Sequence, residues 1–321
     1  MDHQKFLGSE HPIVCLPMNR VSNIDLAIAV AKAGCLPSII MVAYSADDGK
    51  VFREEKFKMD MLKFRLEVGN CNIIVSMTDF FLAAHHDRVV KMIQMFGITH
   101  IEILPYYGNQ MRRLKNGEGL EETSYSLENY IKHLVKIKSM GCKIIVKCLA
   151  YPIEPVSENL AQHKVIDAII VKSALGAGKV SPYYTNLVEL VSKAKKKYPT
   201  VHIIASGGVS TPKDIKDCIK AGAIAVGIGT IFALSKESKI NAKTKEALIS
   251  KNSEDISAIG RSGLGLNAIV LNQHRGPDDD NFSQSLELGV RGEGGHLYIG
   301  HGIDHVNEIF SVSDIVKRLT T

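Results

Sequence analysis

The stretch that decides the fold is residues 202–230, which read HIIASGGVSTPKDIKDCIKAGAIAVGIGT. It opens with a β-branched apolar run, typical of a buried strand. A helix start at Thr211-Pro212 leads into a helical pattern that stops at Gly222, and a second apolar run follows at 223–227. A buried strand, a helix and another buried strand in this order form one unit of a parallel α/β sheet.

The same alternation runs through most of the chain. Besides the two runs above, short apolar runs that predict buried strands occur at 13–16, 38–41, 72–76, 100–104, 143–147 and 167–171. Eight strand–helix units predict a (β/α)8 TIM barrel in the α/β class. The competing fold is an open doubly wound sheet, which usually carries a Gly-x-Gly-x-x-Gly turn after its first strand. This chain has Pro17-Met18-Asn19-Arg20 there, which favours the barrel.

Composition and charge exclude several classes of protein. The 321 residues are 45% hydrophobic and 23% charged, ordinary values for a globular chain that can bury a core. A formal charge of +5 is small for this length, so we expect no nucleic-acid partner. The absence of a long apolar run and of a signal-peptide layout predicts a cytoplasmic protein with no membrane partner. The six cysteines form no Cys-x-x-Cys pair, and no metal site is expected.

The regular alternation stops after Val226. Residues 235–299 begin with a charged helical stretch at 236–250 and continue into a Gly- and Asp-rich segment, which is too long for a routine barrel loop. We therefore expect a TIM barrel at 1–234 and 300–321, with 235–299 forming a small inserted lid before the closing helix at 313–319.

Two glycine-rich segments follow the seventh and eighth predicted strands, at the end of a barrel where active sites form. Ser206-Gly207-Gly208 follows one strand, and Gly227-Ile228-Gly229-Thr230 follows the other. Glycines let backbone N–H groups approach an anion closely, and barrels often bind phosphate at these two loops. The pair predicts a phosphate-binding site but does not name the ligand.

The first predicted strand and its loop narrow the choice. The stretch 12–27, with Pro17-Met18 after the strand, resembles the opening of the nitronate monooxygenase family, formerly called 2-nitropropane dioxygenases. The Ser-Gly-Gly and Gly-x-Gly-Thr segments and the closing Gly300-His301-Gly302-Ile303 are similar to the family's segments at the same places. The resemblance covers most of the chain and implies an FMN-dependent barrel oxidoreductase, in a family that also includes enoyl reductases.

The resemblance also implies roles for particular residues. Pro17, Met18 and Asn19 would contact the isoalloxazine ring, and Ser76, ending the third strand, would be a polar flavin ligand. Lys147 would reach the flavin N1–C2=O edge, where a cation stabilises the anionic reduced form. The remaining cofactor contacts would come from the loop after strand six and from the phosphate loops: Gly176, Gly178, Ser206, Gly207, Gly208, Gly227, Gly229 and Thr230.

One departure from the family pattern bears on catalysis. Where the family has Glu-Ala-Gly-Gly-His, whose histidine is the base, this chain has Leu175-Gly176-Ala177-Gly178-Lys179. Lys179 therefore stands in the place of the catalytic histidine, and we expect it to supply charge rather than to accept a proton. Lys179 and Lys147 are the candidate catalytic residues, and the chain is expected to prefer anionic nitronates over neutral nitroalkanes.

Several alternatives stay open at this point. The phosphate loops also suit a flavin-free lyase, isomerase or synthase, or an enzyme similar to IMP dehydrogenase and GMP reductase, although Ser181 stands near the place of their nucleophilic cysteine. A non-catalytic flavin-binding barrel is a third reading. For the leading hypothesis we expect a small anionic, nitro or enoyl-type substrate, with O2 or NAD(P)H as the second reactant. The sequence leaves a homodimer open.

Overall fold

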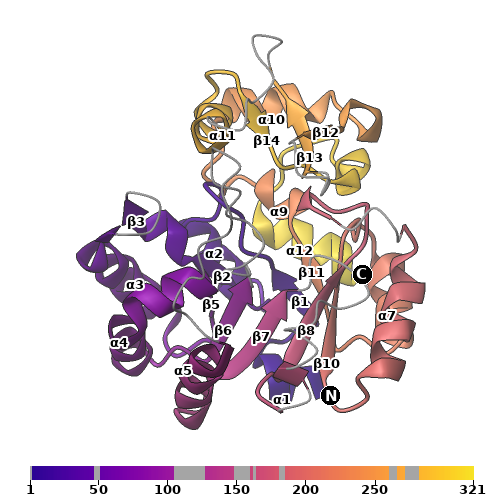
Figure 1. Ribbon diagram of the computed structural model, residues 1–321. Helices are drawn as coiled ribbons and strands as arrows, with labels where there is room; N and C mark the ends of the chain where they lie inside the picture. Colours follow the sequence, from indigo (N-terminus) through magenta and orange to yellow (C-terminus); the bar gives the residue numbers. More distant parts are fainter. Residues whose placement is uncertain are drawn as a thin grey trace, which may run out of the picture.

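Eight parallel strands form one closed barrel, which confirms the TIM-barrel prediction (Figure 1). The computed structural model describes residues 2–46, 51–104, 127–147, 160–161, 164–180, 185–259, 266–271 and 282–321. The barrel strands are β1 (Ile13–Cys15), β2 (Ser38–Ile40), β5 (Ile74–Thr78), β6 (His100–Leu104), β7 (Lys143–Lys147), β8 (Ala168–Lys172), β10 (His202–Ser206) and β11 (Ala225–Ile228). The sheet closes where the amide of Cys15 donates to the carbonyl of Leu36 at 3.0 Å.

A ring of helices covers the outside of the barrel, as alternation of buried strands with amphipathic helices requires. The ring contains α2 (Ile24–Lys32), α3 (Glu54–Val68), α4 (Asp79–Phe96), α5 (Leu127–Ser139), α7 (Leu187–Lys197), α8 (Pro212–Lys220) and α12 (Val312–Thr320). The expected helix start at Thr211-Pro212 is confirmed, because Thr211 forms a capping box with Asp214 at α8, and Asn23 caps α2. The C-terminal helix α12 closes the ring by packing against both α2 and α8.

Several expected boundaries differ from the structure, and two of the differences affect the site. The third barrel strand covers 74–78 rather than 72–76, so Ser76 lies in its middle instead of at its end. The sixth ends at Lys172, a residue that the apolar pattern had assigned to the following loop. The helix expected at 236–250 is α10 (Ala242–Ile249), which begins late because the Asn241 side chain caps it.

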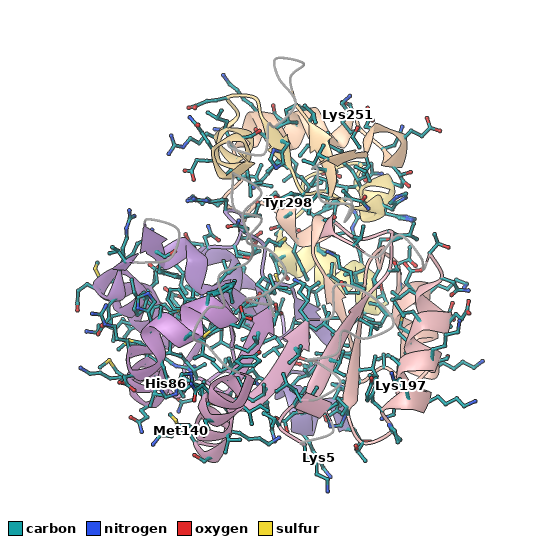
Figure 2. All side chains as sticks on the ribbon, viewed as in Figure 1. Lys5, His86, Met140, Lys197, Lys251 and Tyr298 are labelled. Carbon is teal, nitrogen blue, oxygen red and sulfur yellow. The ribbon has the colours of Figure 1, made fainter. Side chains whose placement is uncertain are left out.

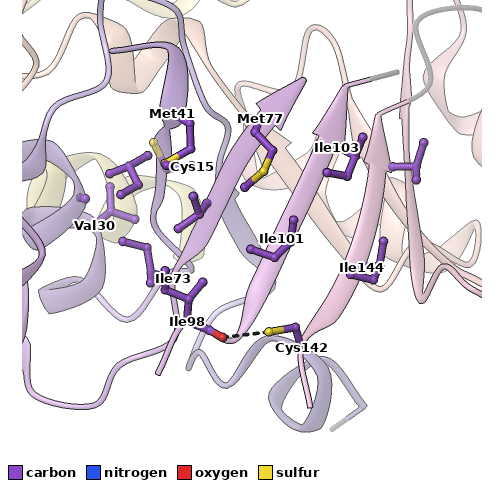
Figure 3. Packing of buried hydrophobic residues seen from close by; sticks show 14 of the residues in the cluster. Cys15, Val30, Met41, Ile73, Met77, Ile98, Ile101, Ile103, Cys142 and Ile144 are labelled. Carbon is purple, nitrogen blue, oxygen red and sulfur yellow. Dashed lines mark hydrogen bonds between the residues drawn. The ribbon is translucent and has the colours of Figure 1, made fainter. Parts of the chain in front are cut away.

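The space between the strands and the helix ring is filled by apolar side chains. Figure 3 shows part of this packing, in which Met41, Met77, Ile101 and Ile144 come from four different segments. Five of the six cysteines are free, and four of these five are buried; Cys148 lies outside the described residues. Cys142 donates its thiol hydrogen to the carbonyl of Ile98 at 3.1 Å, and burial raises its pKa to about 11.

The short helix α1 (Asp2–Leu7) closes the N-terminal end of the barrel. Its Phe6 and Leu7 pack into the apolar cluster inside the strands. Nε2 of His100 donates to the carbonyl of Phe6 at 2.8 Å, and burial lowers the pKa of His100 to about 4. The imidazole is therefore neutral near pH 7, which lets it lie buried beneath this helix without a counterion.

The lid segment lies at the opposite end of the barrel from α1 (Figure 1). Besides α10, it contains β12 (Ser257–Ile259), β13 (Leu266–Val270), α11 (Phe282–Arg291) and β14 (His296–Leu297). The short helix α9 (Thr230–Ala233) leads into it, and the 3-10 turn η5 (His301–His305) leads out. A separate apolar cluster holds the lid together and includes Val21 from the barrel. The expected boundaries at 235 and 299 stay a prediction.

Two further features complete the description. A two-stranded hairpin of β3 (Ser45–Ala46) and β4 (Val51–Phe52) follows the 3-10 turn η1 (Met41–Tyr44). Of the helices in the described part of the chain, none is long and apolar enough to cross a membrane.

Replacing Phe6 by alanine should lower the free energy of unfolding by about 3 to 5 kcal/mol, because it removes a large buried side chain and leaves a cavity at the barrel floor. The matched control is Phe80→Ala, since Phe80 is 43% exposed and its loss should cost much less. Urea denaturation of both variants measures the difference. Equal losses of unfolding free energy in the two variants would contradict the conclusion that α1 closes the N-terminal end of the barrel.

Candidate active site

Polar side chains line the barrel interior near its C-terminal end. Every second residue of a barrel strand points inward. The inward residues nearer α1 include the apolar Ile74, Ile145 and Ile170 together with polar ones such as His100. Nearer the barrel mouth, the next inward side chain of five strands is polar. We call these five residues the polar layer: Ser76 of β5, Glu102 of β6, Lys147 of β7, Lys172 of β8 and Ser206 of β10.

Glu102 lies at the centre of the polar layer and is 1% exposed. The hydroxyl of Ser76 donates to its Oε1 at 3.1 Å, and Nζ of Lys147 lies 3.8 Å from the same oxygen. The other oxygen, Oε2, is buried and has no hydrogen-bond partner among the described residues. Burial raises the pKa of Glu102, and Lys147 and Ser76 partly oppose this shift because both favour the ionised form.

Lys172 places a second cation in the same layer. Its ammonium donates to the carbonyl of Ala177 in the loop after β8. Burial and then the positive charge of Lys147 lower the pKa of Lys172 to about 7, while Glu102 acts in the opposite direction. A Cβ at Gly176 would lie 2.4 Å from Cε of Lys172, so the glycine leaves room for this side chain. With all three groups ionised, the layer carries one excess positive charge.

The loop after β8 is fixed in place by the lid. Nδ2 of Asn267 in β13 donates to the carbonyls of Ala174 and Gly176, both at 2.8 Å. The amide of His301 donates to the carbonyl of Leu175 at 2.9 Å, close to where Gly300 packs against the loop backbone. Directly after the loop, β9 (Gly178–Lys179) pairs antiparallel with β13. The loop is therefore connected to the sheet of the lid.

The segments after β10 and β11 differ in the space they leave. Gly207 has φ +97, and a Cβ there would lie 2.7 to 2.9 Å from atoms of Ser173, so its conformation and packing both require glycine. Gly229 has a φ of −116, and among the described residues a Cβ there would meet only Sδ of Met18, at 3.9 Å. Gly229 therefore borders open space, which is what a bound anion would need. Thr230 accepts the amide hydrogen of Gly300 at 3.0 Å.

The loop after β1 brings the Pro-Met-Asn segment to the same end of the barrel. The amide of Met18 donates to the Ser22 hydroxyl, and the amide of Ser22 donates back to the carbonyl of Met18, both at 2.9 Å. Arg20 has φ +62, unusual for a residue with a side chain, and pairs with Glu287 of the lid at 3.0 Å. The Oδ1 atom of Asn19 is buried without a hydrogen-bond partner among the described residues.

The structure brings several of the predicted site residues together. Ser76, Lys147 and Ser206 share the polar layer, and Met18 and Gly229 lie close to each other at its rim. Gly178 lies against Tyr298 at the junction of lid and barrel (Figure 2). The backbone of Lys179 is in β9; its side chain and the whole of Ser181 are outside the described residues. No group of side chains with metal-ligand chemistry occurs in the part of the chain that the structure describes.

Sequence reasoning missed three residues of the site: Glu102, Lys172 and Asn267. Glu102 carried a signal, because an acid inside an otherwise apolar buried strand needs a partner. Lys172 lay one residue beyond the apolar run that marked its strand. Asn267 reaches the loop after β8 from almost a hundred residues away, and no local pattern marks such a contact.

A family model for nitronate monooxygenase matches residues 140–321, more than half of the chain. The chain belongs to the nitronate monooxygenase family. A nitronate monooxygenase of Pseudomonas aeruginosa is 24% identical over 280 residues, which cover 82% of this chain and 78% of that protein. Family membership makes the chain an oxidoreductase, points to a flavin cofactor, and favours this class over the flavin-free and non-catalytic alternatives.

Solved structures with the same fold support the barrel assignment. A FabK mutant of Thermotoga maritima has a TM-score of 0.75 at 20% identity and covers 99% of this chain and 94% of its own. A nitroalkane oxidase of Streptomyces ansochromogenes has a TM-score of 0.72 at 17% identity, covering 99% of this chain and 96% of its own. Identities this low show the shared fold alone.

The two glycines give a test of the site geometry. Gly207→Ala should lower the free energy of unfolding by about 1 to 3 kcal/mol, since it adds a clash to a left-handed conformation. Gly229→Ala should leave stability almost unchanged because its Cβ enters open space. Thermal unfolding of the two variants side by side measures this. A large loss in Gly229→Ala would mean that the space beside Met18 does not exist.

Proposed function

We propose that the polar layer and the loops around it bind FMN, and that the chain is an FMN-dependent oxidoreductase of the nitronate monooxygenase type. Its substrate would be a small anionic, nitro or enoyl-type molecule, with O2 or NAD(P)H as the second reactant. The observation that carries this proposal is the polar layer itself: the buried carboxylate of Glu102 lies 3.8 Å from the ammonium of Lys147, and Lys172 can add a second positive charge that an anionic ligand would favour.

The unpaired atoms around the site fit a flavin. Asn19 Oδ1 and Glu102 Oε2 are buried acceptors without a donor among the described residues. An isoalloxazine ring offers an N–H donor as well as carbonyl acceptors, so it can use both kinds of group that this site presents. The open space at Gly229 would take the phosphate, together with Ser206, Gly208 and Thr230.

Bound FMN would supply the two-electron chemistry, and the protein would supply position and charge. Pro17, Met18 and Asn19 would orient the ring from the loop after β1. Ser76 holds Glu102, which in turn lies near Lys147. Lys147 thereby keeps its ammonium at the mouth of the barrel, where a cation would favour the electron-rich form of the ring.

The form of the substrate follows from Lys179. A lysine in place of a histidine base is protonated near pH 7 unless burial depresses its pKa, so it attracts an anion better than it removes a proton. We propose that Lys179 draws in an already ionised nitronate and that the lid above it selects the rest of the substrate.

Gly229→Leu should abolish flavin binding, because the added side chain would occupy the proposed phosphate place, while the fold is kept. The measurement is the visible flavin absorbance per protein after purification, with a melting curve on the same sample. The control is Gly229→Ala, whose single methyl group should reduce flavin content less. Full flavin content in Gly229→Leu would place the phosphate elsewhere.

Turnover of a neutral nitroalkane should be about 10²-fold or more slower than turnover of its nitronate, since proton removal lacks a good base. Lys179→Ala should raise KM for the nitronate with little change in kcat, and the exposed Lys213→Ala should change neither. Oxygen consumption measured with both substrate forms across pH gives the answer. Equal turnover of both forms, with a bell-shaped profile that Lys179→Ala removes, would show that Lys179 is itself the base.

A further inference from the structure

The polar layer contains one cation more than the proposed flavin site requires. Lys147 already faces Oε1 of Glu102, and the hydroxyl of Ser76 donates to the same oxygen. Lys172 acts on Glu102 only through its positive charge. We propose that Lys172 takes up one proton when the flavin held in this site receives two electrons, so that reduction consumes two protons rather than one. The inference rests on the proposed function, because it needs a bound flavin.

The position of Lys172 places it within reach of a ligand above the layer. In the sheet, Lys172 pairs with Ser206 of β10, whereas Lys147 pairs with Ile170 two residues earlier in β8. Lys172 therefore lies nearer the barrel mouth than Lys147. Its side chain keeps partial solvent access and lies beneath Gly176, whose missing Cβ provides the room. A group bound over the layer would come close to Lys172 as well as to Lys147.

The charged groups that act on Lys172 come from two neighbouring strands. Among the described residues they are Lys147 of β7 and Glu102 of β6, while β10 contributes the uncharged Ser206 and the loop contributes the carbonyl of Ala177. Burial and Lys147 lower the pKa of Lys172 to about 7. Lys172 therefore changes its charge near neutral pH, and the neutral amine becomes more populated as the pH rises.

A new negative charge next to Lys172 favours its protonated form. An anion within a few ångströms favours the charged form of an amine and raises its pKa. Between the starting pKa near 7 and the raised value, Lys172 is neutral before reduction and protonated after it. In that window two electrons and one proton convert the oxidised flavin to its anionic reduced form. A second proton from solvent converts the Lys172 amine to an ammonium. A hydride donor of the NAD(P)H type, or an electrode, supplies the electrons.

A comparison within the chain shows why this lysine is unlike an ordinary buried one. Lys245 in α10 is also buried, but its ammonium donates to the carbonyls of Ser235, Lys236 and Ser238, at 2.5, 3.3 and 3.1 Å. Those carbonyls belong to a loop away from the polar layer, so Lys245 has a structural role. Lys172 has one described carbonyl partner and a second cation beside it.

The test is the midpoint potential of the bound flavin as a function of pH, measured by spectroelectrochemistry. Each additional proton per two electrons changes the reduction equilibrium tenfold per pH unit, about 29.6 mV for a two-electron couple. Above about pH 7, we expect the midpoint potential of the wild type to fall with pH more steeply than that of Lys172→Met, by about 29.6 mV per pH unit. Lys172→Arg should also show the shallow slope, because it keeps the charge but cannot release the proton.

Two comparisons keep the result decisive. Lys216→Met removes an exposed lysine from α8 and should keep the steep slope. Lys172→Gln, which retains a donor for the loop carbonyl, replaces either variant that does not fold. A steep slope that persists without Lys172 would assign the second proton to the flavin ring and overturn the inference, as would a shallow slope in the wild type. A purified protein that binds no flavin would instead overturn the proposed function itself.

Discussion

The arrangement that the rest of the structure depends on is the pair of lysines around one buried carboxylate inside the barrel. A charged side chain in an apolar interior is costly unless it is paired or hydrogen-bonded. Here Glu102 has one oxygen held by Ser76 and Lys147 and one without a described partner, and Lys172 adds a further positive charge. A barrel that needed only stability would continue its apolar layers at this level. The polar layer is what the proposed ligand would complete.

The lid influences the candidate site because it holds the loop after β8, which lies next to the polar layer. Asn267 and the backbone near Gly300 hold the loop after β8, and this loop supplies the carbonyl that Lys172 uses. The ion pair between Arg20 and Glu287 links the lid to the loop after β1 on the other side of the barrel mouth. Changes in the lid core can therefore alter the site without touching a ligand.

The barrel was predictable because each strand is a compact apolar run that begins and ends within two residues of its true bounds. Ser76 and Lys147 were identified through the family resemblance, whereas Glu102 was missed although an acid inside an apolar strand needs a partner. Lys172 was missed because a shift of one residue at the strand end moves a side chain from the loop into the barrel interior. Asn267 and the pairing of β9 with β13 depend on contacts distant in sequence, for which local patterns carry no information.

The most direct test of this account is the melting temperature of the flavin-free protein titrated with FMN. If FMN binds at the polar layer, the melting temperature should rise steadily with FMN concentration. At about a hundred times the dissociation constant, the stabilisation should reach about 2.7 kcal/mol. A melting temperature that does not change over the whole range of FMN concentrations would contradict the account.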